Sequence, residues 1–313
     1  MSASLPLRSK QDSNQSHGVW ILFLAPDAGR RGRRDLKESR MQRKTSICLL
    51  VGLAFVSIAA SGCDKLRARD KLNKGVNAYK AAQFDIAIDD FKTAKELDPT
   101  LTNAQLYLAT AYASQYIPGA PSAENVRNGE EAVKEFQSIL QTDPNNLSAI
   151  DGIGSVLYNM AGTPFDAAKL QDSKNYHQKH IQLSPNDPEP YYWIGVIDWS
   201  LAYHGNKDMR DEYNDKAKKT VKESDPMPPT VAPQFSAKYG ETVDEGITGL
   251  KKSIELKPDY DDAMAYLNLL YRQKADMETA ANARDSDLKM ADDLVDKVKA
   301  IKQKKMEAPQ PTS

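Results

Sequence analysis

The most constraining feature of this sequence is a proline that recurs after four helix-like segments. Similar short phrases carry it: Glu96-Leu97-Asp98-Pro99, Gln141-Thr142-Asp143-Pro144, Gln182-Leu183-Ser184-Pro185 and Glu255-Leu256-Lys257-Pro258. Proline ends a helix because its ring fixes φ, and because it disfavours helical geometry in the residue before it. Each phrase is followed within a few residues by another apolar helical pattern, so the chain is built from repeated units.

The first unit has the most regular spacing. Counting back from Pro99, the eighth, twelfth and twenty-fourth positions are occupied by Phe91, Ala87 and Gly75. Small residues at such positions let two antiparallel helices approach, and the aromatic ring fills the space between neighbouring pairs. This spacing resembles that of the tetratricopeptide repeat (TPR). The resemblance implies an all-α fold, a right-handed TPR superhelical solenoid of stacked helix hairpins.

The later units are longer than the first. The interval from the small residue of the first helix to the closing proline is shortest in the first unit and more than twice as long in the fourth, from Gly195 to Pro258. Since a similar ending closes each unit, we expect long insertions inside the hairpins. The longest runs from about His204 to Glu241, and its charged half, Lys207 to Ser224, suits an extra helix. The residues that we assign to repeat positions are Gly75, Ala87, Phe91, Ala94, Pro99, Ala132, Phe136, Pro144, Gly154, Pro185, Gly195 and Pro258.

These intervals set the expected limits of the solenoid. We place it at residues 66–306, preceded by a short linker over 63–65. The tail over 307–313 is polar and Pro-rich, a composition typical of disorder. The expected repeats are about 68–101, 102–146, 147–187, 188–260 and 261–302.

Residues 41–62 have the layout of an export signal. Met41-Gln42-Arg43-Lys44 is basic, and an apolar run extends from Ile47 to Ala60. That run is shorter than the roughly 20 apolar residues that a membrane-spanning helix needs. Residues 1–40 fit no standard signal, so we expect an upstream extension assigned in error, with Met41 the true start, or a disordered segment. Their paired arginines leave a twin-arginine export signal as the alternative.

The signal ends at a cysteine that suggests a lipid anchor. Ala60-Ser61-Gly62-Cys63 resembles the bacterial lipobox, in which the signal is cut before the cysteine and diacylglycerol is attached to it. Cys63 would then be the only cysteine left, because Cys48 lies in the removed segment. Exported proteins usually use cysteines in pairs, so a single one needs another role. The resemblance implies a lipoprotein with diacylglyceryl-Cys63, facing the periplasm from the inner or the outer membrane. The alternatives are an incidental cysteine or a retained anchor.

The composition narrows the function classes. Beyond Gly62 the chain holds 32 Lys and Arg and 39 Asp and Glu, a net charge of about −7. Nucleic-acid binding requires a basic face, so we expect no nucleic-acid partner. The sequence has no Gly-rich phosphate loop, serine nucleophile elbow or paired zinc cysteines. We therefore expect neither catalysis nor a cofactor.

The segment from Tyr191 to Tyr203 is the densest aromatic cluster. In TPR proteins certain positions of each first helix face a groove. Tyr192, Val196 and Trp199 of this cluster stand at such positions, and each of three other units has one residue at such a position. Aromatic residues dominate the binding energy of many protein interfaces. Two other interpretations stay open: the long insertion buries these rings, or they bind cell-wall glycan or a small ligand. The candidate groove residues are Tyr79, Tyr158, Tyr192, Val196, Trp199 and Arg272.

Two histidines one helical turn apart are the weakest candidate site. His177 and His180 could supply half of a metal site, with His204 as a third ligand. They also occupy repeat positions where other units have apolar side chains, which favours packing.

Taken together, the sequence predicts a non-catalytic scaffold that is tethered to a membrane and binds other proteins. It resembles bacterial TPR lipoproteins, a group that includes envelope, secretion and pilus assembly factors. The less favoured functions are glycan or small-ligand binding and an enzyme that uses the histidines.

Overall fold

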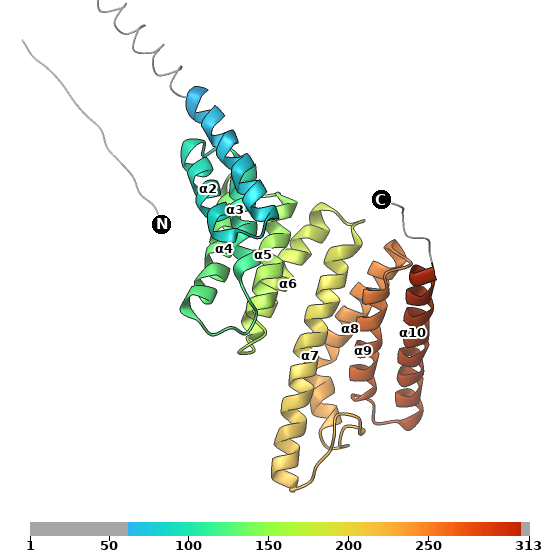
Figure 1. Ribbon diagram of the computed structural model, residues 1–313. Coiled ribbons are helices and arrows are strands. Elements are labelled where there is room, and N and C mark those ends of the chain that lie inside the picture. The colour runs from blue at the N-terminus through green and yellow to red at the C-terminus, as the bar shows by residue number, and fades with distance from the viewer. Residues whose placement is uncertain (1–61, 308–313) are drawn as a thin grey trace, which may run out of the picture. The chain divides into compact units, whose positions relative to one another are not determined.

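The computed structural model describes residues 62–307, and all regular structure in that range is helical (Figure 1). The expected all-α fold is confirmed. Residues 62–80 are helical and include the expected linker; residues 1–61, with the export signal, and the tail from 308 lie outside the described part. The other helices are α2 (Phe84–Leu97), α3 (Thr102–Gln115), α4 (Ala123–Thr142), α5 (Leu147–Met160), α6 (Ala167–Leu183), α7 (Pro188–Ala217), α8 (Ala232–Leu256), α9 (Asp261–Ala275) and α10 (Ala281–Glu307).

The recurring proline sets the joints of the solenoid. Helices α2, α4, α6 and α8 each end two residues before their proline, and the next helix begins three residues after it. The residue in front of the proline is the C-cap in all four cases. This position follows from the steric restriction that proline imposes on the residue before it. The four turns between hairpins therefore have one length, and the extra residues lie within the hairpins.

Each helix packs mainly against its neighbours in the chain, which is the arrangement of a solenoid. Within three hairpins the side chain at the eighth position before the proline presses on a glycine of the first helix. A Cβ atom at Gly75 would lie 2.5 Å from Phe91, one at Gly154 2.7 Å from His177, and one at Gly195 2.3 Å from Leu250. Only glycine permits so close an approach of the two helices.

The long insertion does not form the expected extra helix. Helix α7 runs unbroken for 30 residues and α8 for 25, so most of residues 204–241 lengthen the hairpin into an arm. The extension of α7 is suited to a helix, since Lys207 pairs with Asp211 and Glu212 with Lys216, each one turn apart. It ends at Lys218, whose left-handed backbone conformation stops the helix.

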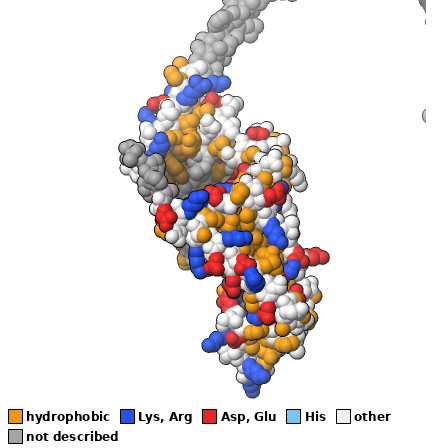
Figure 2. All heavy atoms as spheres, turned by 90° about the vertical axis from the view of Figure 1, so that its right-hand side faces the viewer, with side chains coloured by type: hydrophobic (Ala, Val, Ile, Leu, Met, Phe, Trp, Pro, Cys, Tyr) orange, Lys and Arg blue, Asp and Glu red, His pale blue; other side chains and the backbone are white. Residues whose placement is uncertain are grey.

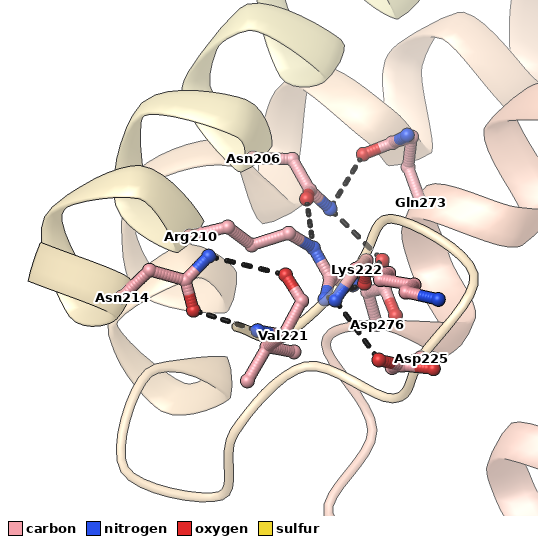
Figure 3. A network of polar contacts seen from close by, with 8 residues as sticks. All are labelled: Asn206, Arg210, Asn214, Val221, Lys222, Asp225, Gln273 and Asp276. Atoms are coloured by element: carbon pink, nitrogen blue, oxygen red, sulfur yellow. Dashed lines mark hydrogen bonds and ion pairs between the residues drawn. The ribbon is translucent and has the colours of Figure 1, made fainter. Parts of the chain in front are cut away.

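A buried polar network fixes the arm to the next hairpin (Figure 3). The Arg210 side chain is almost fully buried, and its Nη2 donates to Asp276 Oδ2 at 2.7 Å. Asn206 donates to the same carboxylate and to Gln273 at 2.9 Å. Asn214 bonds both backbone groups of Val221 and closes the turn that follows α7. The arm is thus an ordered part of the solenoid.

The C-terminal helix covers the open end of the stack. Ala291 and Leu294 of α10 are buried against α9, with Val298 and Ile301 partly buried beside them. The remaining faces of α10 are charged, which suits a capping helix. No helix among residues 62–307 is both long and apolar enough to span a membrane.

Candidate functional site: the inner face of the solenoid

The first helices of successive hairpins form one surface. Helix α3 contacts α5, α7 contacts α9, and the rings of Tyr158 and Trp193 join α5 to α7, whereas successive second helices have no backbone contacts of that extent among the described residues. Helices on the inside of a curved stack lie closer together, so we call the surface of α3, α5, α7 and α9 the inner face.

Counting from the preceding proline gives equivalent positions on these helices. The eighth residue is Tyr107 in α3, Gly152 in α5, Trp193 in α7 and Tyr266 in α9. The fourteenth residue is Ala113, Tyr158, Trp199 and Arg272 in the same order.

The fourteenth residue of one helix meets the eighth residue of the next. The ring centroids of Tyr158 and Trp193 are 5.3 Å apart, and those of Trp199 and Tyr266 are 5.4 Å apart. Both pairs are edge-to-face, the arrangement that aromatic quadrupoles favour. Two of the three inner joints between α3 and α9 are therefore filled by a pair of aromatic rings.

The joint between α3 and α5 holds no such pair, because its two positions are Ala113 and Gly152. A cavity of about 460 Å³, open to solvent, lies there instead. A cavity of this size falls within the range usual for ligand sites. Gly152 cannot take a larger side chain in place, since a Cβ atom would lie 2.4 Å from the ring of Phe136. Figure 2 shows a hollow with hydrophobic side chains at the level of these hairpins.

The cavity has a lining without Lys, Arg, Asp, Glu or His. Its apolar part includes Leu106, Tyr107, Tyr116, Phe136 and Val156. Its polar part consists of short side chains with hydroxyl or amide groups, namely Asn103, Thr110, Ser148, Ser155 and Asn159. Tyr107 is 39% exposed, and Phe91 stacks on it with a centroid distance of 5.5 Å. This arrangement suits an uncharged group that carries apolar surface.

Between α5 and α9 the rings join into a chain. Trp193 meets Tyr192 at 5.5 Å, Tyr192 meets Tyr266 at 5.8 Å, and Trp199 stacks on Tyr203 at 5.2 Å. These residues are half-buried, so their rings stabilise the joints while part of each remains accessible. Burial, with a smaller contribution from Tyr266, raises the pKa of Tyr158 to about 12, so its hydroxyl stays a neutral donor.

The structure separates the six candidate groove residues. Tyr158, Tyr192 and Trp199 belong to the chain of rings. Val196 is only 1% exposed and lies beneath the surface, so it supports the rings rather than facing a partner. The other two stand apart from the chain: Tyr79 bonds Ser114 at 2.9 Å beside α3, and Arg272 pairs with Asp292 of α10 at 2.6 Å.

The two histidines have different surroundings. His177 is 1% exposed, stacks on Trp193 at 5.7 Å, and has no hydrogen-bond partner for either ring nitrogen within the described residues. Burial lowers its pKa to about 4. His180 Nδ1 bonds Asp151 Oδ1 at 2.6 Å. Residues 62–307 contain no group of three or more His, Cys, Asp or Glu side chains that could hold a metal.

A buried ion pair joins α6 to α7. Lys174 Nζ of α6 lies 2.6 Å from Asp198 Oδ1 of α7 and 2.8 Å from Glu245 Oε2 of α8. Burial raises the pKa of Asp198 to about 7, although Lys174 opposes the shift. This pair lines no part of the cavity. We therefore assign it a structural role in the joint between α6 and α7.

Sequence reasoning missed the cavity because a site made by small residues has no motif of its own. Comparing the eighth and fourteenth residues after each proline would have revealed Ala113 and Gly152 as exceptions. Tyr266 escaped notice because its ring contacts α7 only across the joint between hairpins.

Solved structures share this architecture over nearly all of their length. The crystal structure of MamA protein matches 79% of this chain and 98% of its own, with a TM-score of 0.51 and 17% identity. The MamA RS-1 ArsTM double mutant matches 76% and 96%, with a TM-score of 0.50 and 15% identity. YrrB, described as a TPR protein with an unusual peptide-binding site, matches 74% and 90%, with a TM-score of 0.43 and 16% identity.

Identities this low show the fold alone. No protein-family model matches the chain, and no curated protein matches its sequence. The hairpins and their repeat positions define an all-α TPR solenoid with long insertions inside its repeats, and the fold shared with the two MamA structures agrees with it.

Proposed function

We propose that this protein is a non-catalytic scaffold that binds other proteins through its inner face. The observation that carries the proposal is the cavity between α3 and α5, which lies on the same face as the chain of rings. The groups with strongly shifted pKa values outside the tyrosines, His177 and Asp198, are buried away from this cavity. The cavity thus offers surface for recognition and no acid–base pair for chemistry.

We further propose that the chain is tethered to a membrane at Cys63 and faces the periplasm, in envelope, secretion or pilus assembly. The Cys63 side chain is exposed, so an attached lipid would not disturb the packing of the described residues. Residues 62–80 hold six basic and two acidic residues, whereas residues 81–313 hold 26 basic and 37 acidic ones. A basic segment beside a lipid anchor is attracted to anionic headgroups, and the acidic remainder is not.

Cross-linking and affinity purification from the native membrane test the binding function. Ser155→Arg places a charge in the cavity and should lower partner recovery about tenfold, because a charge in an apolar site is costly unless paired. Gln137→Arg adds the same charge on the exposed outer side of α4 and is the matched control. Equal recovery with both variants would exclude the cavity. Binding of the purified protein to peptidoglycan, with no protein recovered, would favour a glycan ligand instead.

The tether has its own experiment. Radiolabelled fatty acid should enter the wild-type protein and not Cys63→Ser. Label in the variant, or none in either protein, would argue against a lipid at this cysteine.

A further inference from the structure

We infer that the cavity between α3 and α5 receives an aromatic side chain from an uncharged segment of the partner. This inference rests on the proposed function, since it specifies the chemistry of the partner at the same site.

The repeat equivalence defines the shape of the cavity. At the other two inner joints a ring from the fourteenth position meets a ring from the eighth position, at 5.3 and 5.4 Å. At the α3–α5 joint those positions are Ala113 and Gly152, and both line the cavity. The backbone repeats while the two rings are missing, so the space has the shape that rings fill elsewhere in the same molecule.

The cavity walls offer several contacts to an entering ring. Tyr107, Tyr116 and Phe136 line the cavity, so edge-to-face contacts are possible on more than one side. Ser155 of α5 and Thr110 of α3 also line the cavity and offer hydroxyl groups to a peptide backbone or to a tyrosine or tryptophan polar atom.

The lining of the cavity is uncharged, which disfavours the binding of an ionised side chain. Acidic and basic residues are absent from the walls of this cavity, so a charged side chain would lose its hydration without gaining a partner. A neutral residue that carries a ring meets no such cost. Leucine would fit by polarity but would leave the edge-to-face contacts unmade.

Titration calorimetry of the full chain with short capped Gly/Ser peptides tests this directly. Each peptide carries one central Trp, Phe, Ala, Glu or Lys. The Trp and Phe peptides should bind at least about tenfold more tightly than the Ala peptide, from burial of the ring. The Glu and Lys peptides should bind no better than the Ala peptide. Equal affinity for all five peptides, or preference for a charged one, would overturn the inference.

A variant that fills the cavity with a ring of its own tests the same site. Ala113→Trp supplies a ring at the position that Tyr158 and Trp199 occupy in the next two helices, so it should fill the cavity and preserve the fold. We expect it to weaken Trp-peptide binding at least about tenfold, with a melting temperature no lower than that of the parent. Ala168→Trp, on the exposed side of α6, is the control and should bind as the parent does. Unchanged binding by Ala113→Trp would place the peptide elsewhere.

The two proposals fail in different ways. If aromatic peptides do not bind but Ser155→Arg still loses its partner, the scaffold function stands and the aromatic anchor is wrong. If the peptides bind and no protein is recovered from the membrane, the cavity chemistry stands and the scaffold function is wrong.

Discussion

The inner joint between α3 and α5 and the joints between α5 and α9 use the same backbone for opposite purposes. In the latter, rings from neighbouring hairpins fill the space and hold the stack together. In the former, Ala113 and Gly152 leave the space open. Neighbouring hairpins remain in contact at both, so the solenoid does not need the ring pair at every joint. The joint between α3 and α5 is therefore available to bind a partner.

Trp199→Ala should have the largest effect on stability, because the ring contacts Tyr203 and Tyr266 at a filled joint. We expect the free energy of unfolding to fall by about 3 kcal/mol. Tyr107→Ala, at the open joint, removes a ring that is 39% exposed and should cost about 1 kcal/mol. Urea denaturation of both variants measures the difference. Similar losses would mean that the two kinds of joint contribute alike.

His177→Phe tests how a buried group next to the filled joint between α5 and α7 makes the stability of the fold depend on pH. Burial lowers the pKa of His177 to about 4 from 6.5, so below 6.5 the unfolded chain takes up a proton that the folded chain excludes. Wild-type stability should therefore fall as the pH drops from 6.5 to 4, by up to about 3 kcal/mol from this group.

Position 177 is equivalent in the repeat to Phe91 and Phe136, so a phenylalanine introduced there should fit. The variant should lack the pH dependence that His177 causes. Denaturation at several pH values compares the slopes of the two proteins. Parallel curves would show that folding does not lower the pKa of His177, since the folded and unfolded chains would then take up its proton over the same pH range.

Ala113→Leu should have the smallest effect, and in the opposite direction. It partly fills the open joint with apolar volume, so we expect a gain of about 0.5–1 kcal/mol in the free energy of unfolding. The same change should weaken peptide binding. A loss of stability would show that the cavity walls are already in contact with another group, which would contradict an open joint.

The closing prolines predicted the helix ends because proline acts locally, and four helices end two residues before one. The arm was misjudged because a charged helical pattern after Tyr203 fits a separate helix or a continuation of α7 equally well. The contacts of Asn206 and Arg210 with Asp276, which lies far away in sequence, hold the continuation of α7 in place.

Only part of the candidate site could be predicted from the sequence. The cluster around Tyr192 was identified from its composition. Its role in the joint was not, because the contacts cross to Tyr158 and Tyr266 on other helices. The pairing of Lys174 with Asp198 had no sequence signal at all.

The arm has a mechanical consequence. Stacked hairpins behave as a spring whose compliance is the sum of its joints. Helix α7 has 30 residues, which makes it about 45 Å long. Arg210 binds its far half to the end of α9, so this helix splints one joint along its length. Bending should then concentrate in the N-terminal half, where the open joint lies. A partner that seats a ring between α3 and α5 would stiffen a joint that this splint does not reach. Arg210→Ala should release the splint, and small-angle scattering should then show greater bending.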